Sequence, residues 1–197
     1  MPIAHPDFPH FHTVLSDPKW IAPWTGEVFR QAAPRWLSKP YRFTGVGSVL
    51  AGSRLAGRWL MPAVYASTNP YTLHAEAYHK GRRYGWSPDD LKAQLIIGMR
   101  WQLQAVVDLT APIILKALGV KKSELLACDW VGGQNAGNEP LTQAIARAAF
   151  ENFAEGLVVP CARVRGGVNI VYYPTHRRDR TVIQTPDEAN IPFMHGL

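Results

Sequence analysis

Three arginines and one carboxylate within residues 41–79 carry the clearest chemical signal in this sequence. Arg42, Arg54 and Arg58 lie among glycines, and Glu76 follows them. Guanidinium groups bind phosphate oxygens bidentately, so cations on a glycine-rich backbone suit a phosphate-bearing ligand. A single carboxylate beside such a site suits a reaction that builds positive charge. We therefore expect a site for a phosphorylated small molecule in this stretch.

Local signals place these side chains on a strand, a loop, a second strand and a helix. Residues 41–43 predict a short strand, a glycine-rich loop follows, and residues 63–67 predict the second strand. A helix then starts at Pro70, with one of the residues 68–69 as its N-cap. This helix carries Glu76 beside its apolar face. The candidate carboxylate is therefore expected on a rigid element.

The remaining pattern is mixed. Further elements are expected in this order: a helix start at Ser87, a long strand over 93–108, helices over 112–118 and 122–127, a Gly/Asn-rich loop over 132–138, a helix over 140–154, a strand hairpin over 157–162 and 168–173, and an edge strand over 181–184. This order lacks strict βαβ alternation, and Gly45-Val46-Gly47 lacks the third glycine and the helix of a dinucleotide-binding fingerprint. We predict an α+β fold with short mixed or antiparallel sheets flanked by helices.

The sequence predicts one domain whose N-terminal and C-terminal segments differ in composition from its central part. Residues 1–40 are rich in Pro and Trp, which predicts an ordered N-terminal wrap with one short helix at 26–32. Residues 41–174 form the main body, and residues 175–197 form a polar C-terminal extension. His5, His10 and His12 have no Cys or carboxylate cluster around them, so no metal site is predicted.

Composition limits the function classes. With 197 residues, 47% of them hydrophobic, the chain is long enough for a sizeable core. The net charge of +6 permits binding to nucleic acid, an acidic protein or a phosphorylated small molecule. The absence of a five-residue basic run disfavours a nucleic-acid arm. Two distant cysteines predict a reducing compartment, and with no signal-peptide or membrane-span pattern we expect a soluble, cytoplasmic protein without membrane contact.

The chain resembles the RES-domain proteins, the toxin half of bacterial Xre–RES toxin–antitoxin pairs. The resemblance covers roughly residues 40–174 and rests on motifs in a fixed order: Tyr41-Arg42, Gly52-Ser53-Arg54, Gly57-Arg58-Trp59, Pro62-Ala63-Val64-Tyr65-Ala66-Ser67, Ala75-Glu76, the segment 157–163 and the segment 167–171. It implies an ADP-ribosyltransferase-like fold, NAD as substrate, and loss of nicotinamide. The implied outcomes are NAD depletion by phosphorolysis or hydrolysis, or ADP-ribosylation of a protein target. A helical Xre-type antitoxin that covers the active site is the implied partner.

The resemblance also implies roles for residues of the NAD site. Glu76, Arg42 and Tyr65 are the candidate catalytic residues. Glu76 stabilises the developing ribosyl cation or orients the acceptor through a ribose hydroxyl, Arg42 binds the pyrophosphate with Arg54, and Tyr65 stacks on the nicotinamide or ribose. The candidate NAD-binding residues are Tyr41, Arg42, Arg54, Arg58, Tyr65, Cys161 and Asn169. Arg54 is preferred as the arginine of the central motif, and Arg58 stays open. Cys161 occupies the position of the family's serine, with Asn169 as a neighbour that could take over its role.

Two other function classes remain open on the sequence alone. The pI near 9.5, seven Trp residues and His74 with His79 would suit a basic RNA-binding module or nuclease. The two histidines are five residues apart and fall on different faces of a helix, which argues against that class. A non-catalytic interaction domain is the third possibility. Direct nucleic-acid binding is not predicted.

Overall fold

The computed structural model describes residues 2–32, 43–58, 60–83, 85, 87 and 95–185. Its centre is one sheet of six strands: β1 (Ile21–Ala32), β2 (Val64–Ser67), β3 (Leu95–Asp108), β4 (Gly156–Pro160), β5 (Val168–Tyr172) and β6 (Val182–Gln184). The order is β1-β2-β5-β4-β3-β6, and β1 also pairs with β3, so the first five strands close into a barrel. The β3–β4 pair is parallel and the other pairs are antiparallel. The predicted α+β class is confirmed, with one closed sheet rather than several short ones.

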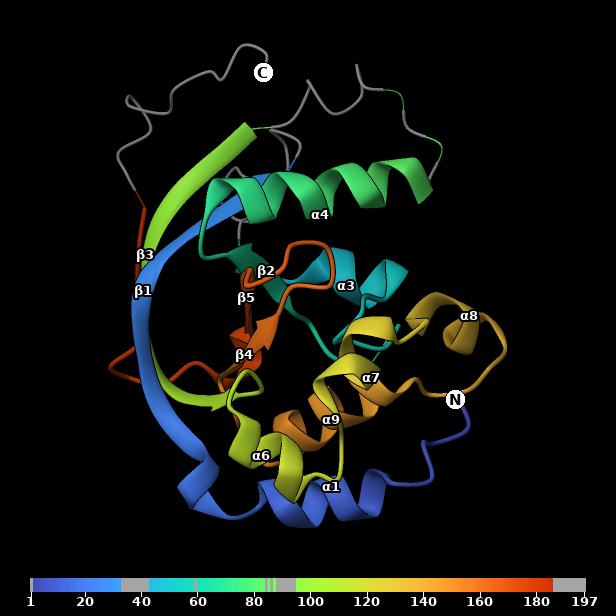
Figure 1. Cartoon of the computed structure of the whole chain (residues 1–197). Helices are drawn as coiled ribbons and strands as arrows, with labels where there is room; N and C mark the ends of the chain where they lie inside the picture. Colours follow the sequence, from blue (N-terminus) through green and yellow to red (C-terminus); the bar gives the residue numbers. More distant parts are fainter. Residues whose placement is uncertain are drawn as a thin grey trace.

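The longest pairing joins β1 to β3, the two curved strands along one side of Figure 1. It runs from Ile21 opposite Val107 to Ala32 opposite Leu95. The helix predicted at 26–32 is therefore wrong: Val28 and Phe29 are β-formers on a strand that alternates inside and outside, and Val28 is fully buried. This part of the N-terminal segment belongs to the sheet and does not wrap around it.

The helices cover one end of the barrel and one side. They are α1 (Phe8–Leu15), α3 (Val46–Ala51), α4 (Pro70–Arg83), α6 (Pro112–Ala117), α7 (Lys122–Ala127), α8 (Trp130–Asn135) and α9 (Leu141–Glu151), with short 3-10 turns at Pro18–Trp20 and Pro174–His176. The expected second strand, hairpin, edge strand and helices at 70, 112, 122 and 140 are confirmed. The sequence predicted loops in two places where the structure forms short helices, α3 and α8, so these two predictions were wrong. The strand expected at 41–43 and the helix expected after Ser87 fall largely outside the described residues, and Phe43 is not in a strand.

Strand alternation separates two apolar clusters. One cluster consists of strand residues such as Val28, Val64, Trp101 and Ile170, and fills the barrel. The other lies between the outer face of the sheet and the helices α1, α6, α7 and α9 (Figure 1), and includes Val171 with the small α9 residues. Outward-facing positions of β2 and β5 therefore point toward the helical side. In the described part of the chain, no helix is long and apolar enough to cross a membrane.

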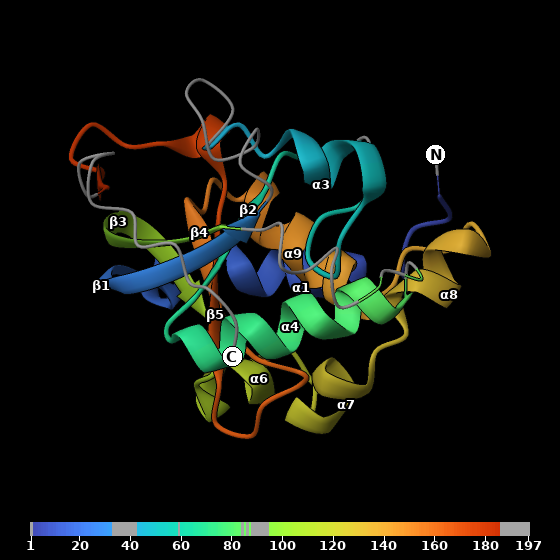
Figure 2. The ribbon, with the colours of Figure 1, turned by 90° about the horizontal axis from the view of Figure 1, so that it is seen from above.

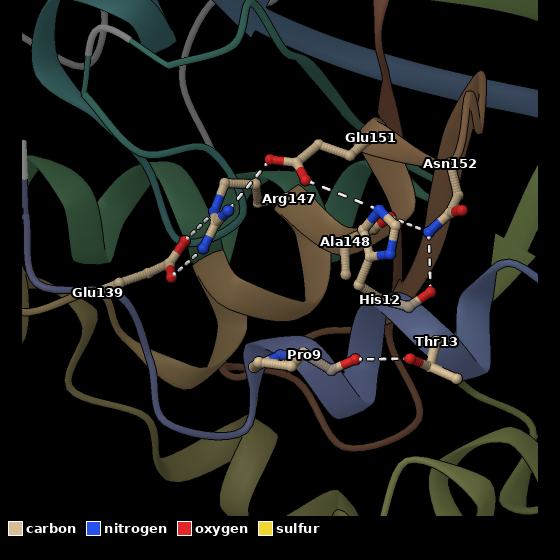
Figure 3. A network of polar contacts seen from close by, with 8 residues as sticks. All are labelled: Pro9, His12, Thr13, Glu139, Arg147, Ala148, Glu151 and Asn152. Carbon is tan, nitrogen blue, oxygen red and sulfur yellow. Dashed lines mark hydrogen bonds and ion pairs between the residues drawn. The ribbon is translucent and has the colours of Figure 1, made fainter.

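An ion-pair network fixes the N-terminal segment to α9 (Figure 3). Arg147 donates to both carboxylate oxygens of Glu139, with Nε–Oε1 at 2.6 Å and Nη2–Oε2 at 2.8 Å. Its Nη1 donates to Glu151 at 3.1 Å, and the ring of His12 lies 3.8 Å from the other Glu151 oxygen. The backbone amide of His5 donates to Glu139 at 3.1 Å. The Glu139 side chain is 2% exposed, and through its contacts with Arg147 and the His5 amide it joins the N-terminal segment to α9.

Candidate active site

The Glu76 carboxylate receives two hydrogen bonds from the β4–β5 hairpin. Cys161 Sγ donates to Glu76 Oε1 at 3.0 Å, and Asn169 Nδ2 donates to the same oxygen at 3.2 Å. Cys161 directly follows β4 and Asn169 lies within β5. Among the described residues, no donor reaches the second oxygen, Oε2. Within the described part of the chain, the carboxylate is thus held through one oxygen only.

The start of α4 explains why Glu76 faces the hairpin. Asn69 caps the helix, because its Oδ1 accepts the Thr72 amide hydrogen at 2.7 Å, as predicted. Thr72 and Glu76 are four residues apart and share one helix face, and Thr72 is fully buried. Figures 1 and 2 show the β4–β5 connection beside this helix. Contact is close because Gly167 has no side chain: a Cβ there would lie 2.8 Å from Thr72 Oγ1 and 3.0 Å from Cys161 Cβ.

Ser67 orients the Asn169 amide. The two residues face each other in the β2–β5 register, and Ser67 Oγ donates to Asn169 Oδ1 at 2.6 Å. The amide oxygen is thereby engaged, which turns the NH₂ group toward Glu76. Sequence reasoning placed Asn169 in the site and missed Ser67. The available signal was the period of two along β2, which puts Ser67 on the same face as Tyr65.

The surroundings of Cys161 favour a protonated thiol that donates a hydrogen bond. Its side chain is buried, and its backbone amide donates to Gly167 O at 2.8 Å. Burial raises the pKa of the thiol, and the hydrogen bond to Glu76 raises that pKa further. The thiol therefore keeps its proton at neutral pH. Reactive cysteines need the opposite environment, one that favours the thiolate.

Arg54 lies in the electrostatic field of Glu76. Its guanidinium donates to the carbonyl oxygens of Leu125, at the end of α7, and Pro160, the residue before Cys161. Burial lowers the pKa of Arg54, and the negative charge of Glu76 is the largest influence that raises it. No carboxylate forms an ion pair with Arg54 within the described part of the chain. A partly buried cation held only by neutral acceptors can attract an anionic ligand.

Tyr65 holds the loop that carries Arg54. Its hydroxyl lies 2.5 Å from Ser53 Oγ and accepts the Leu55 amide hydrogen at 2.9 Å. Burial raises the pKa of this hydroxyl, so it remains protonated. Tyr65 as a whole is half-buried and packs against the helical core cluster. Its predicted stacking on the nicotinamide or ribose stays a prediction, while its hydroxyl has a structural role that the sequence did not indicate.

The structure separates the two candidate arginines of the central motif. Arg54 lies close to Glu76 and Cys161, whereas Arg58 is exposed and lines a different cavity, with Gln134 and Gln143. Tyr41 and Arg42 lie outside the described residues, so their predicted roles stay predictions. The described residues contain no group of three or more His, Cys, Asp or Glu side chains that could hold a metal ion. The arrangement is thus a carboxylate with fixed donors and an adjacent cation.

The family model of the RES domain matches residues 27–193. The chain belongs to the RES domain family. The resemblance seen in the sequence is therefore confirmed, and the match includes Glu76, Cys161 and Asn169.

Among the relatives is the NAD(+) phosphorylase MbcT of Mycobacterium bovis and of two Mycobacterium tuberculosis strains. Each is 27% identical over 160 residues, which covers 74% of this chain and 77% of the relative. Among solved structures, the crystal structure of the M. tuberculosis MbcT–MbcA toxin–antitoxin complex contains a chain that matches with a TM-score of 0.69 and 20% identity. That match covers 90% of both chains, so the RES protein described here has the same overall fold.

Proposed function

We propose that this RES protein is a toxin that consumes NAD by breaking the bond between nicotinamide and ribose. The observation that carries the proposal is Glu76: Cys161 and Asn169 donate to one of its oxygens, and among the described residues neither its second oxygen nor the charge of Arg54 has a charged or donating partner. The family membership and the mycobacterial relatives named NAD(+) phosphorylase support the same reaction.

The proposed chemistry needs one carboxylate and no general acid. As the glycosidic C–N bond breaks, its electron pair goes to the pyridinium nitrogen, so nicotinamide leaves as a neutral molecule. Positive charge moves to the ribose, whose transition state resembles the oxocarbenium ion of glycoside hydrolysis. Glu76 stabilises this charge through Oε2, because its other oxygen is engaged by Cys161 and Asn169. An acceptor oxygen then forms the new bond to the anomeric carbon.

Arg54 would bind the pyrophosphate of NAD. It keeps a full charge at any working pH, and its guanidinium fork fits phosphate oxygens. The carbonyls of Leu125 and Pro160 already orient it, so little side-chain entropy would be lost on binding. Arg42 and Tyr41 would complete this part of the site.

For the acceptor we propose inorganic phosphate, in line with the name of the mycobacterial relatives. The product would then be ADP-ribose carrying a phosphate on its anomeric carbon. The alternative to phosphate as acceptor is a protein side chain, which would make the protein an ADP-ribosyltransferase. We also propose that the fold is related to that of the ADP-ribosyltransferases. The partner would be a cognate helical antitoxin, since the matching solved structure is a toxin–antitoxin complex. The cytoplasm, which holds NAD and phosphate, would be its place of action.

The test is NAD turnover by the purified protein, with and without inorganic phosphate, followed by ³¹P NMR of the products. We expect NAD loss that depends on phosphate and yields one new sugar-phosphate signal. Phosphate-independent loss with free ADP-ribose would replace phosphorolysis by hydrolysis. Turnover only after addition of a protein acceptor would favour the transferase branch, and no turnover under any of these conditions would refute the proposal.

A further inference from the structure

A cavity lies beside the loop that carries Arg54, and two residues of this loop, Gly57 and Arg58, help to line it. It has a volume of about 310 Å³, and its lining includes Gly57, Arg58, Gln134, Asn135, Asn138 and Gln143. Side-chain amides thus dominate its polar surface, with one cation and no carboxylate among the lining residues. Neither Glu76 nor Cys161 lines it, so the cavity is separate from the cluster that would perform the chemistry.

The amides fall into two groups with different roles. Gln143 is 2% exposed, and its Nε2 donates to Ser53 O at 2.7 Å and to Gln134 Oε1 at 3.2 Å. These bonds attach the loop to α9 and α8, and so fix the wall of the cavity. Asn135 and Asn138, in contrast, have exposed side chains without a hydrogen-bond partner in the described part of the chain. The cavity therefore combines a fixed wall with amide heads that are free to bind.

We propose that this cavity binds the adenine base of an adenine nucleotide. A side-chain amide offers a donor and an acceptor side by side, which matches the N6 and N7 edge of adenine. The Arg58 guanidinium can stack on the face of the base, as arginine planes do on unpaired bases.

This proposal rests on the proposed function in one respect: NAD, the proposed substrate, itself contains an adenine base that the cavity could bind. Arg54 and Arg58 are four residues apart, so the backbone between them spans at most about 14 Å. In this form of the proposal, one NAD molecule has its pyrophosphate at Arg54 and its adenine at Arg58. This would give both arginines of the central motif a part in binding, with Arg54 near the reaction and Arg58 at the far end of the substrate. A separate regulatory adenine nucleotide would use the same chemistry.

The experiment compares two substrates that contain the same scissile bond. Nicotinamide mononucleotide carries the nicotinamide–ribose bond but no adenosine. Replacing one binding amide should raise KM for NAD about 5- to 10-fold, the effect of one lost hydrogen bond. For Asn135→Leu and Asn138→Leu, we therefore expect this increase in KM for NAD, an unchanged kcat, and unchanged kinetics with nicotinamide mononucleotide. Gln184→Met, a change on the exposed edge strand β6, is the matched control and should leave both substrates unaffected.

Binding of AMP, measured by calorimetry, tests the cavity without any turnover. We expect AMP to bind the wild-type protein and to bind both Asn variants at least 5-fold more weakly. Competition between AMP and NAD would assign the cavity to the substrate's own adenine, and AMP binding without competition would assign it to a separate nucleotide; both outcomes support the site. Equal AMP affinity in wild type and variants, or no AMP binding at millimolar concentration, would overturn it. An inactive wild-type protein would refute the proposed function, and the AMP measurements would still decide on the cavity.

Discussion

Replacing Glu76 by Gln tests the role of its charge without changing its shape. Cys161 and Asn169 both donate to Oε1, and an amide oxygen in that place can still accept both bonds. The substitution therefore keeps the contacts between α4 and the hairpin. What it removes is the negative charge at Oε2, where the ribosyl cation would develop.

The loss can be estimated from Coulomb's law. Two unit charges about 4 Å apart interact with about 4 kcal/mol at the effective dielectric constant of 20 that suits sites near a protein surface. Glu76 is partly buried, which places it in this range. At 1.36 kcal/mol for each factor of ten, kcat should fall about 10³-fold in Glu76→Gln. KM should change little, because the charge acts mainly in the transition state.

The assay is steady-state NAD turnover in phosphate buffer, with thermal unfolding of the same samples. Glu27→Gln is the matched control, since Glu27 is an exposed carboxylate on β1 that is distant in sequence from the site. We expect wild-type kinetics for this control and a melting temperature for Glu76→Gln close to that of wild type. A correctly folded Glu76→Gln protein that keeps more than a tenth of the wild-type kcat would refute the assignment of Glu76.

Three further substitutions test the supporting structure. Because the folded protein raises the pKa of Cys161, its thiol contributes stability below the ordinary value of 9.0, and this contribution is lost as the pH rises through the higher folded-state pKa. The melting temperature of wild type should therefore fall relative to Cys161→Ser above pH 9, and parallel curves would contradict this. Gly167→Ala would place a Cβ 2.8 Å from Thr72 Oγ1, so we expect about 1–3 kcal/mol lower stability and reduced kcat, measured by urea unfolding and NAD turnover. Glu139→Gln should lower the free energy of unfolding by about 1–3 kcal/mol without changing kcat, because it removes the charge-assisted hydrogen bonds of Glu139 while Arg147 keeps Glu151 as a partner; an unchanged urea midpoint would show that the Glu139–Arg147 pair contributes nothing.

The parts of the fold with strong local signals were predictable. The start of α4 is encoded by Asn69 and Pro70, and the β4–β5 hairpin by two apolar runs around a Gly-Gly pair. β1 was not predicted at 26–32, because its pairing with β3 depends on residues about 70 positions away, such as Met99 opposite Val28. Prolines in the same segment suggested an irregular chain, and tertiary pairing overrode that local tendency.

The site was predictable only as a set of residues and not as a geometry. The family resemblance alone is enough to group Glu76, Cys161 and Asn169 in one site. Ser67 and the carbonyl of Leu125 were not predicted, although they orient Asn169 and Arg54. Both contacts link residues about 70 to 100 positions apart, and a backbone carbonyl has no sequence signal at all. Supporting groups of this kind follow from the closure of the barrel and not from any local pattern.

These supporting contacts would explain how Cys161 can stand at the serine position that the family resemblance predicts for it. A thiol is a weaker donor than a hydroxyl, so Cys161 alone would hold the Glu76 carboxylate less firmly than a serine would. Asn169 donates to the same oxygen, and Ser67 fixes its amide through a 2.6 Å hydrogen bond. Two donors on one oxygen set the position of the carboxylate even if one of them is weak. Because both donors are neutral, neither cancels the negative charge that the proposed reaction would use at Oε2.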